Sequence, residues 1–370
     1  MRITAGMMMS DYQKTLESNL NRLNDESDKI SSERKFSRGS QDPVAAMKTL
    51  RTNRQLANVS QYQQNVSEAT SWMTATESSV KNVDQILQSA NEMIVQAKNG
   101  TYNVSDAQNQ AKSIDSYQQE IVDTLNSTFN GQYIFGGTAS GPQPFKIGTA
   151  ADLTGANADV DTAVTTFDSN QVVGKLLFNI PNTNTYIPVS AINNSTTGDP
   201  GTSDYKYSIN NPAMKYTMPV DLGLGIKTDA ATHNVVGGTA FESSTSALDF
   251  LILNPTGTSS VNIVDSLAGA SQQLNSGATP LLDDTLNMVQ STQDAELKST
   301  VVVGEKSKLL DYIGNKLIDD NTNLTSRLSS IADVDITQES TNYQMDQMVY
   351  QASLSIGSTI LQHSLIDFLK

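Results

Sequence analysis

The sequence contains no cysteine, two histidines and one tryptophan. The lack of cysteine excludes a disulfide scaffold, thiolate zinc sites and a cysteine nucleophile. His233 and His363 lie in unrelated sequence contexts, and no G-x-S-x-G, P-loop or HExxH motif is present. Cysteine, histidine and these motifs carry much of the known enzymatic and metal-binding chemistry. We therefore expect a protein without catalytic activity, without a bound metal and without a cofactor.

Charged side chains and long apolar runs are also scarce. Charged residues make up 17% of the chain, compared with about 25% in an average soluble protein. No apolar run approaches the ~20 residues of a membrane span, and no cleaved signal peptide is visible at the start. The net charge of −15 disfavours nucleic-acid binding. We therefore expect neither membrane insertion nor a nucleic-acid partner, and secretion would need another route.

The charge is unevenly distributed along the chain. Residues 1–54 carry 10 basic and 7 acidic side chains, whereas residues 271–370 carry 6 basic and 13 acidic ones. Opposite charges on neighbouring helices attract each other. This asymmetry predicts that a helix near the start pairs with a helix near the end.

A heptad repeat in residues 59–97 is the most regular pattern in the sequence. It predicts one long helix that begins at Pro43, where Asp42 is suited to cap it, and ends at Asn99-Gly100. Asp42 and Pro43 could also form a hinge. The seam of this rod is expected at Val59, Val66, Met73, Val80, Leu87 and Ile94.

Further helices are expected on both sides of a central segment. One should start at Ser105 as its N-cap and end near Phe129, and helix returns near Val261 and dominates from residue 281 onward. The last helix carries two apolar stripes, the first of them Met345, Val349, Ala352 and Ile356. Stripes without a partner inside the chain predict an assembly interface, formed by Leu16, Leu20, Leu23, Ile30, Tyr350, Leu354, Leu361, Leu365 and Phe368.

The composition changes in residues 131–262. Gly, Thr, Asn and Pro become frequent and the helical periodicity disappears. Strand-like runs occur at Tyr133–Phe135, Val172–Ile180, Thr185–Val189, Tyr205–Ile209, Tyr216–Val220 and Phe250–Ile252. The segment is expected to be an inserted β-rich domain that could be shortened without loss of assembly.

These patterns together predict an α+β protein whose two ends fold jointly into a long helical bundle. We expect a terminal coiled-coil assembly domain of residues 1–42 and 332–370. A helical rod of residues 43–130 and 263–331 should follow, with residues 131–262 as a surface domain inserted into it.

Several segments resemble bacterial flagellins and flagellin-like hook-associated proteins. Ser40-Gln41-Asp42-Pro43 is similar to an S-x-D-P element of this family, with Gln41 where an acidic residue is usual. The resemblance covers roughly residues 1–137 and 280–370, whereas residues 140–262 resemble no family that we can name. Further similar segments are residues 87–101, 131–137, 324–335 and 364–368.

The resemblance implies a structural subunit that is exported unfolded by the flagellar type III apparatus. It implies a place in the flagellum at the junction between hook-associated protein 1 and the flagellin filament. The implied partners are copies of the same chain, hook-associated protein 1, flagellin and an export chaperone. Two alternatives stay open: the filament flagellin itself, and a flagellin-like subunit whose inserted domain is an adhesin.

Overall fold

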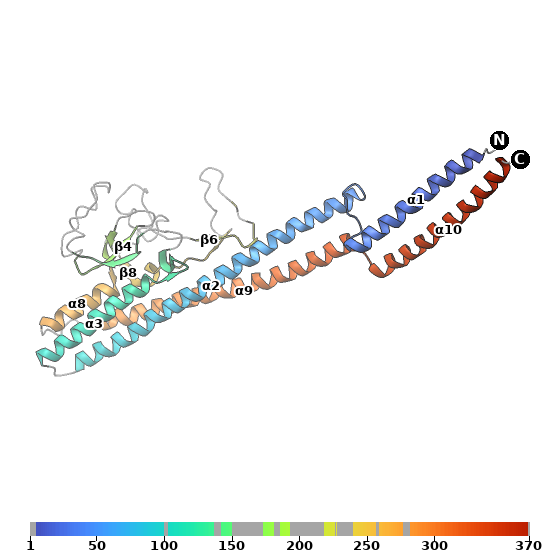
Figure 1. The fold of residues 1–370 in the computed structure, drawn as a ribbon. Coiled ribbons are helices and arrows are strands. Elements are labelled where there is room, and N and C mark those ends of the chain that lie inside the picture. The colour runs from blue at the N-terminus through green and yellow to red at the C-terminus, as the bar shows by residue number, and fades with distance from the viewer. Residues whose placement is uncertain are drawn as a thin grey trace. The chain divides into compact units, whose positions relative to one another are not determined.

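The computed structural model describes residues 5–99, 103–136, 142–149, 173–180, 186–192, 218–225, 227, 240–256, 259–276 and 282–368. Long helices dominate, with small antiparallel sheets in the middle of the chain, so the predicted α+β class is confirmed (Figure 1). The chain divides into two compact units, Met1–Gln61 with Lys316–Lys370, and Tyr62–Asn315. The three domains expected from the sequence stay a prediction.

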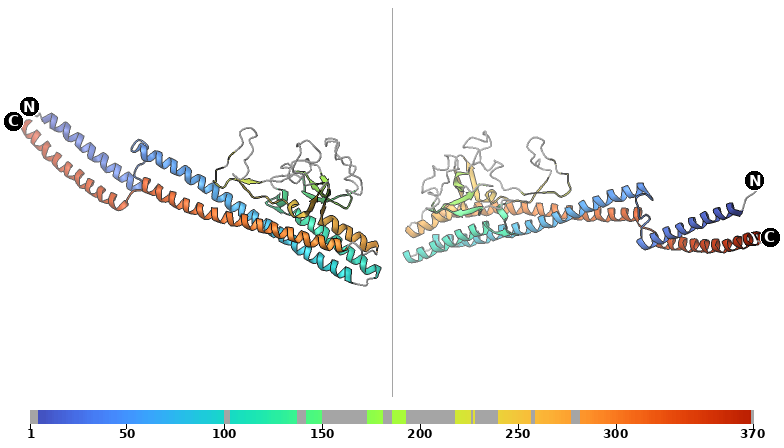
Figure 2. Two further views of the ribbon diagram at one scale, coloured as in Figure 1. Left: turned by 180° about the vertical axis from the view of Figure 1, so that it is seen from behind. Right: turned by 45° about the horizontal axis from the view of Figure 1, so that its top comes forward.

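Two long helices, α2 (Pro43–Asn99) and α9 (Leu282–Ala332), contribute to both units. In the second unit they run antiparallel and side by side (Figures 1 and 2). Every α2 residue of the predicted seam is buried: Val59, Val66, Met73, Val80, Leu87 and Ile94. The facing residues of α9 follow their own heptad spacing, and buried among them are Leu282, Val289, Val303 and Leu310.

Two shorter helices, α3 (Val104–Leu125) and α8 (Ile263–Ser276), pack against each other in the second unit. The Ser271 hydroxyl donates to the carbonyl of Ala111 at 3.2 Å. The predicted cap of α3 was wrong, because the Asn103 side chain, and not Ser105, accepts the Asp106 N–H at 2.9 Å. Its predicted end near Phe129 was also wrong, since Thr128–Phe129 pairs as a strand.

The sheets are short and antiparallel. The largest has the order β3-β4-β5, in which Phe178 lies opposite Phe145 on one side and Ile187 on the other. The remaining strands form pairs β1-β2, β6-β7 and β8-β9. The bounds are β1 Thr128–Phe129, β2 Gln132–Tyr133, β3 Phe145–Ile147, β4 Leu176–Asn179, β5 Tyr186–Pro188, β6 Pro219–Val220, β7 Phe241–Glu242, β8 Ile252–Thr256 and β9 Ser259–Asn262.

The strand predictions were partly right. β4, β5 and β6 lie inside predicted runs, but Phe250 and Leu251 belong to the short helix α7 (Leu248–Leu251), and Ile134 and Phe135 belong to the 3-10 helix η1 (Ile134–Gly136). A second 3-10 helix, η3 (Val189–Ala191), follows β5. The run Tyr205–Ile209 lies outside the described residues.

The strand-rich part shares one hydrophobic core with the helices. Phe135, Phe145 and Phe250 are buried in the same cluster as Ile114 of α3 and Leu267 of α8. The rings of Phe135 and Phe250 meet edge to face, with centroids 6.1 Å apart. This shared core argues against an insertion that can be removed without affecting the bundle.

Asp265 in the first turn of α8 ties the three-stranded sheet to the helices. Its carboxylate accepts the Leu176 N–H at 2.8 Å and the Asn262 side-chain amide at 2.9 Å. Burial raises the pKa of Asp265, and these two hydrogen bonds act in the opposite direction. The carboxylate therefore fixes the position of β4 against the start of α8.

In the first unit, α1 (Ala5–Ser32) and α10 (Ile336–Phe368) run antiparallel along each other, which brings the two termini to the same end of the pair (Figures 1 and 2). Within the part of the chain that the structure describes, no helix is long and apolar enough to span a membrane.

Candidate assembly surfaces

The face of α1 toward α10 alternates between apolar and polar residues. Leu16, Leu23 and Ile30 occupy one position of a seven-residue repeat and are half-buried. Tyr12, Asn19 and Glu26 occupy the alternate position and are also half-buried. Spacings of three and four place both sets on one side of the helix, so apolar and polar residues alternate along this face of α1.

The matching face of α10 is more polar still. Glu339, Asp346 and Gly357 are buried, and Tyr343, Tyr350 and Ser353 are half-buried. A Cβ on Gly357 would lie 2.0 Å from the Tyr12 hydroxyl, so the Tyr12 ring occupies the space beside that glycine. On the α10 side the contact is therefore made by tyrosines, a glycine and charged groups rather than by an apolar stripe.

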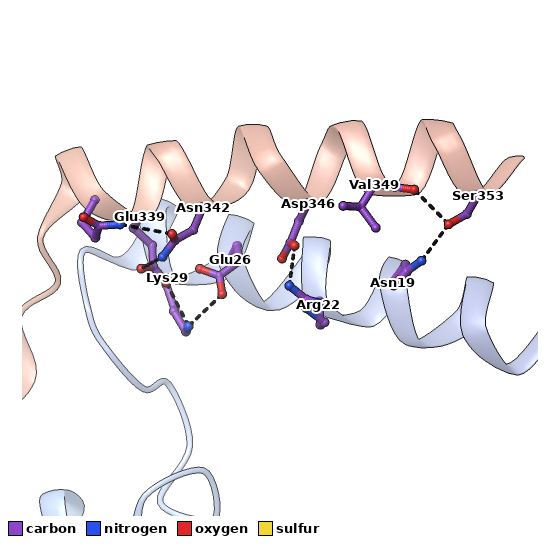
Figure 3. A network of polar contacts seen from close by, with 10 residues as sticks. Asn19, Arg22, Glu26, Lys29, Glu339, Asn342, Asp346, Val349 and Ser353 are labelled. Carbon is purple, nitrogen blue, oxygen red and sulfur yellow. Dashed lines mark hydrogen bonds and ion pairs between the residues drawn. The ribbon is translucent and has the colours of Figure 1, made fainter. Parts of the chain in front are cut away.

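Among the described side chains of α1 and α10, three polar contacts cross from one helix to the other (Figure 3). The Asn19 amide donates to the Ser353 hydroxyl at 2.8 Å, and the Lys29 ammonium donates to Glu339 at 2.9 Å. The third contact joins the Arg22 guanidinium to Asp346 at 2.5 Å. We call these six residues the polar ladder. Its two ion pairs confirm the predicted attraction between a basic start and an acidic end.

Glu26 lies beside the last of these contacts, and its side chain is 16% exposed. Lys29 donates to it at 3.1 Å, and its other carboxylate oxygen is buried without a hydrogen-bond partner among the described residues. Burial, together with the neighbouring Glu339 carboxyl group, raises the pKa of Glu26. The neighbouring Glu26 carboxyl group lowers the pKa of Glu339, and the hydrogen bond that Lys29 donates to Glu339 raises the pKa of Lys29. Two carboxyl groups thus share one cation.

A second surface of α10 is apolar and uncovered. Met345, Met348, Val349 and Ile356 are 44–62% exposed, and Ala352 between them is exposed as well. We call these five residues the apolar face of α10. Their spacing of three and four places them on one side of the helix, beside the polar ladder and not on it. No described residue of α1 covers them.

The residues predicted to form an assembly interface differ in how exposed they are in the structure. Leu16, Leu23, Ile30 and Tyr350 are half-buried in the pair of helices, whereas Leu20 and Leu354 are exposed. The side chains of Leu361, Leu365 and Phe368 lie outside the described residues. The interface role of all of these residues stays a prediction. The sequence predicted the apolar stripe that begins at Met345 but not the polar ladder. Periodic patterns in a sequence are recognised from apolar residues, so they do not single out polar contact residues.

The segment before α2 is held by side-chain caps. The Asp42 carboxylate accepts the Ala45 N–H at 2.9 Å, and the Gln41 side chain accepts the Ser37 and Arg38 N–H groups at 2.8 and 3.1 Å. Gln41 therefore closes this turn through its amide oxygen. The hinge role predicted for Asp42 and Pro43 stays a prediction.

In the described ranges, no three His, Cys, Asp or Glu side chains gather as they would around a metal ion. His233 and the side chain of His363 lie outside those ranges. Among the described residues, the pair of α1 and α10 carries two surfaces with a chemical character of their own, the polar ladder and the apolar face of α10.

Comparison with known proteins identifies the helical framework. Residues 3–140 match the bacterial flagellin N-terminal helical region. This match confirms the resemblance to flagellin-like proteins that the sequence motifs predict. It covers α1, α2 and α3, which include the ladder residues of α1 and the whole rod seam of α2.

Curated relatives with flagellar names match parts of the chain. Flagellar hook-associated protein 3 of Salmonella typhimurium is 29% identical over 146 residues, which are 39% of this chain and 46% of that protein. Its Escherichia coli namesake is 34% identical over 107 residues, 29% of this chain and 34% of that protein. The flagellar filament 41 kDa core protein of Borreliella burgdorferi is 28% identical over 146 residues, 35% of this chain and 42% of that protein. The chain spans less than half the length of these relatives.

A solved structure shares the fold. A Vibrio parahaemolyticus protein described as a flagellar hook-associated protein aligns with 79% of this chain and all of its own chain, with a TM-score of 0.53 and 14% identity. At this identity the likeness concerns the fold alone.

Proposed function

We propose that this chain is a structural, non-enzymatic subunit of the bacterial flagellum that forms the junction layer between the hook and the filament. In that layer it contacts copies of itself, hook-associated protein 1 and flagellin. The observation that carries the proposal is the flagellin N-terminal helical region at residues 3–140. The two relatives named flagellar hook-associated protein 3 favour the junction over the filament.

The apolar face of α10 gives this proposal a physical basis. Full burial of a Met, Val or Ile side chain contributes about 1.5–3 kcal/mol, and the face holds four such side chains. A contiguous apolar stripe on the surface of a soluble protein usually marks an interaction site. Neighbouring subunits would cover it in the flagellum, and an export chaperone would cover it before secretion through the flagellar type III apparatus.

Substitutions on this face test the assembly role. Met348→Asp with Ile356→Asp places two charges in the proposed contact, where unpaired buried charges are strongly destabilising. Gln351→Asp adds a charge at an exposed α10 position outside the face and serves as the matched control. In cells that lack the native protein, the double variant should be secreted but leave flagellin unassembled in the medium, and the control should restore filaments.

Normal filaments with the double variant would refute the assembly role of the apolar face. Melting temperature and circular dichroism of the purified variants should stay within error of the native protein, because the substituted side chains are exposed in the single chain. A lowered melting temperature would show that the face belongs to the fold of the single chain, which also contradicts the proposal.

A filament subunit is the second candidate, favoured by the match to the Borreliella burgdorferi filament protein. The two candidates differ in the position of the subunit and in its copy number. A junction subunit forms one short layer, whereas a filament subunit repeats along the whole length.

A further inference from the structure

The pairing of α1 with α10 does not bury the apolar face of α10, although the hydrophobic effect would favour its burial against α1. Four of the five residues of the apolar face directly precede a residue on the side of α10 that faces α1: Met345 precedes Asp346, Val349 precedes Tyr350, Ala352 precedes Ser353 and Ile356 precedes Gly357. The two sets therefore have the same spacing and differ by one residue, which is a rotation of about 100° around the helix axis.

A competing pairing is consequently available to the same two helices. Turning α10 by about 100° would place Met345, Val349, Ala352 and Ile356 against Leu16, Leu23 and Ile30 of α1. That arrangement is the apolar seam of an ordinary helix pair. The observed arrangement buries Glu339 and Asp346 instead and leaves the apolar face exposed. Some other interaction must select the observed face.

We propose that the polar ladder selects which face of α10 meets α1, and so keeps the apolar face turned outward for a partner. The ladder repeats every seven residues on α10, at Glu339, Asp346 and Ser353, so its rungs lie on one side of the helix. Rotation toward the apolar pairing separates all three rungs at once. It would leave Arg22 and Lys29 without their α10 partners.

Tyr12 and Gly357 add a steric element to the same selection. The Tyr12 ring fills the space beside Gly357, at the end of the pair away from Lys29. In the rotated pairing Ile356 would take the place of Gly357 and its side chain would meet that ring. Buried polar residues at seam positions fix register and partner choice in coiled coils, often with a loss of stability. In this helix pair the loss of stability corresponds to the apolar face of α10, which stays exposed instead of being buried against α1.

Site-specific crosslinking tests the proposal, because the chain has no native cysteine. Asn19→Cys with Ser353→Cys reports the observed pairing, in which these side chains touch at 2.8 Å. Asn19→Cys with Ala352→Cys reports the rotated pairing. Both reporters keep the two ion pairs of the ladder. A short thiol-specific crosslinker is added to the purified full-length chain at high dilution, and the rate of intramolecular crosslinking is followed by mass.

Charge reversal and charge restoration supply the comparison. In the otherwise native chain the first reporter should react faster than the second. Arg22→Asp with Lys29→Asp should lower the ratio of the two rates by about fivefold or more. Adding Asp346→Arg and Glu339→Lys restores two opposite-charge pairs and should restore the ratio. Arg22→Lys, which keeps the charge, should leave the ratio near its native value.

An unchanged ratio after charge reversal would overturn the proposal. So would a ratio that charge restoration does not recover, because the reversed residues would then act only through the local fold. If both rates fall together, the ladder holds the helices together without choosing between the faces of α10, and the proposal is also wrong. The outcome does not depend on where the protein sits in the flagellum.

Discussion

Glu26 of α1 and Glu339 of α10 accept hydrogen bonds from the same ammonium group, at 3.1 and 2.9 Å from the Lys29 nitrogen. One cation is insufficient to neutralise two carboxylates, and Glu26 is the member whose pKa is raised, by burial and by the neighbouring Glu339 carboxyl group. The pairing of the terminal helices should therefore respond to pH.

The direction of this response follows from the two pKa shifts. The raised pKa of Glu26 contributes to the stability of the helix pair. This contribution is fully present below the ordinary pKa of 4.5 and is lost as the pH rises through the pKa that Glu26 has in the folded protein. The lowered pKa of Glu339 also contributes to the stability of the helix pair. This contribution is present above the ordinary pKa of 4.5 and is lost as the pH falls through the pKa that Glu339 has in the folded protein. The helix pair should be most stable between the two folded pKa values and should gain stability from about pH 7 to about pH 5.

Glu26→Gln should remove most of this gain. A neutral amide has no charge to desolvate and can donate to Glu339, so the pair should be stabilised at about pH 7 by roughly 0.5–1.5 kcal/mol. Hydrogen exchange of the α1 amides at about pH 7 and pH 5 measures the effect. Glu17→Gln, an exposed change on the same helix, is the control. An identical pH response in the native chain and Glu26→Gln would contradict this account.

Glu296 in the α9 seam should limit the stability of the second unit at neutral pH. The residue is 4% exposed and accepts the Thr300 hydroxyl at 2.7 Å. Burial is the main cause of its raised pKa, and the charge of Asp84 acts in the same direction. Glu296→Gln should raise the free energy of unfolding at about pH 7 by on the order of 1 kcal/mol, with a smaller gain near pH 4. Urea unfolding at both pH values provides the measurement, and a loss of stability at neutral pH would show that the charge is favourably placed.

Gly223 should be sensitive to a side chain. Its φ is +78°, and a Cβ there would lie 2.6 Å from the Tyr62 ring of α2. The same turn is tied to α2 by the Asn65 amide, which donates to the Asp221 carbonyl at 2.7 Å. Gly223→Ala should cost about 1–2 kcal/mol for the backbone and more for the displaced ring.

Gly225 provides the matched control for this substitution. It has a φ of +84°, and a Cβ there would meet nothing within 4 Å. Gly225→Ala should cost only the backbone component of about 1–2 kcal/mol. Thermal unfolding of the two variants separates the steric from the backbone effect, and equal losses would mean that the turn does not pack on Tyr62 in solution.

The shared core of the second unit predicts that damage to its strand-rich part unfolds its helices. Phe250 is fully buried and packs against Phe135, so Phe250→Ala should cost about 3–5 kcal/mol. The loss should appear in the helical circular dichroism signal as one cooperative transition. A helical signal that melts at the native temperature would instead support the independent insertion that the sequence suggests.

Local signals in the sequence predicted the helices well. Pro43 and Asn99 bound α2 as expected, because the first is a helix-start residue preceded by Asp42 and the second precedes a glycine. The heptad spacing from Val59 onward is likewise local, and it identifies the buried side of α2 without knowledge of the partner.

Features that depend on distant segments were not predictable in the same way. Nothing near Glu26 or Asp346 in the sequence marks them as contact residues, because their burial arises only when α1 and α10 meet. Phe250 and Leu251 read as a strand because aromatic and branched residues favour strands, but packing against the helical core places them in α7. Individual residues of the polar ladder follow only from the structure.

The position of the subunit in the flagellum tests the central claim most directly. Gln143→Cys introduces a single thiol at an exposed residue of a chain that has no other cysteine, so living cells can be labelled with a membrane-impermeant dye. The account predicts one spot per flagellum, where the hook meets the filament, in cells that carry the labelled copy in place of the native one. Dye along the whole length of the filament would contradict it and identify the chain as a filament subunit.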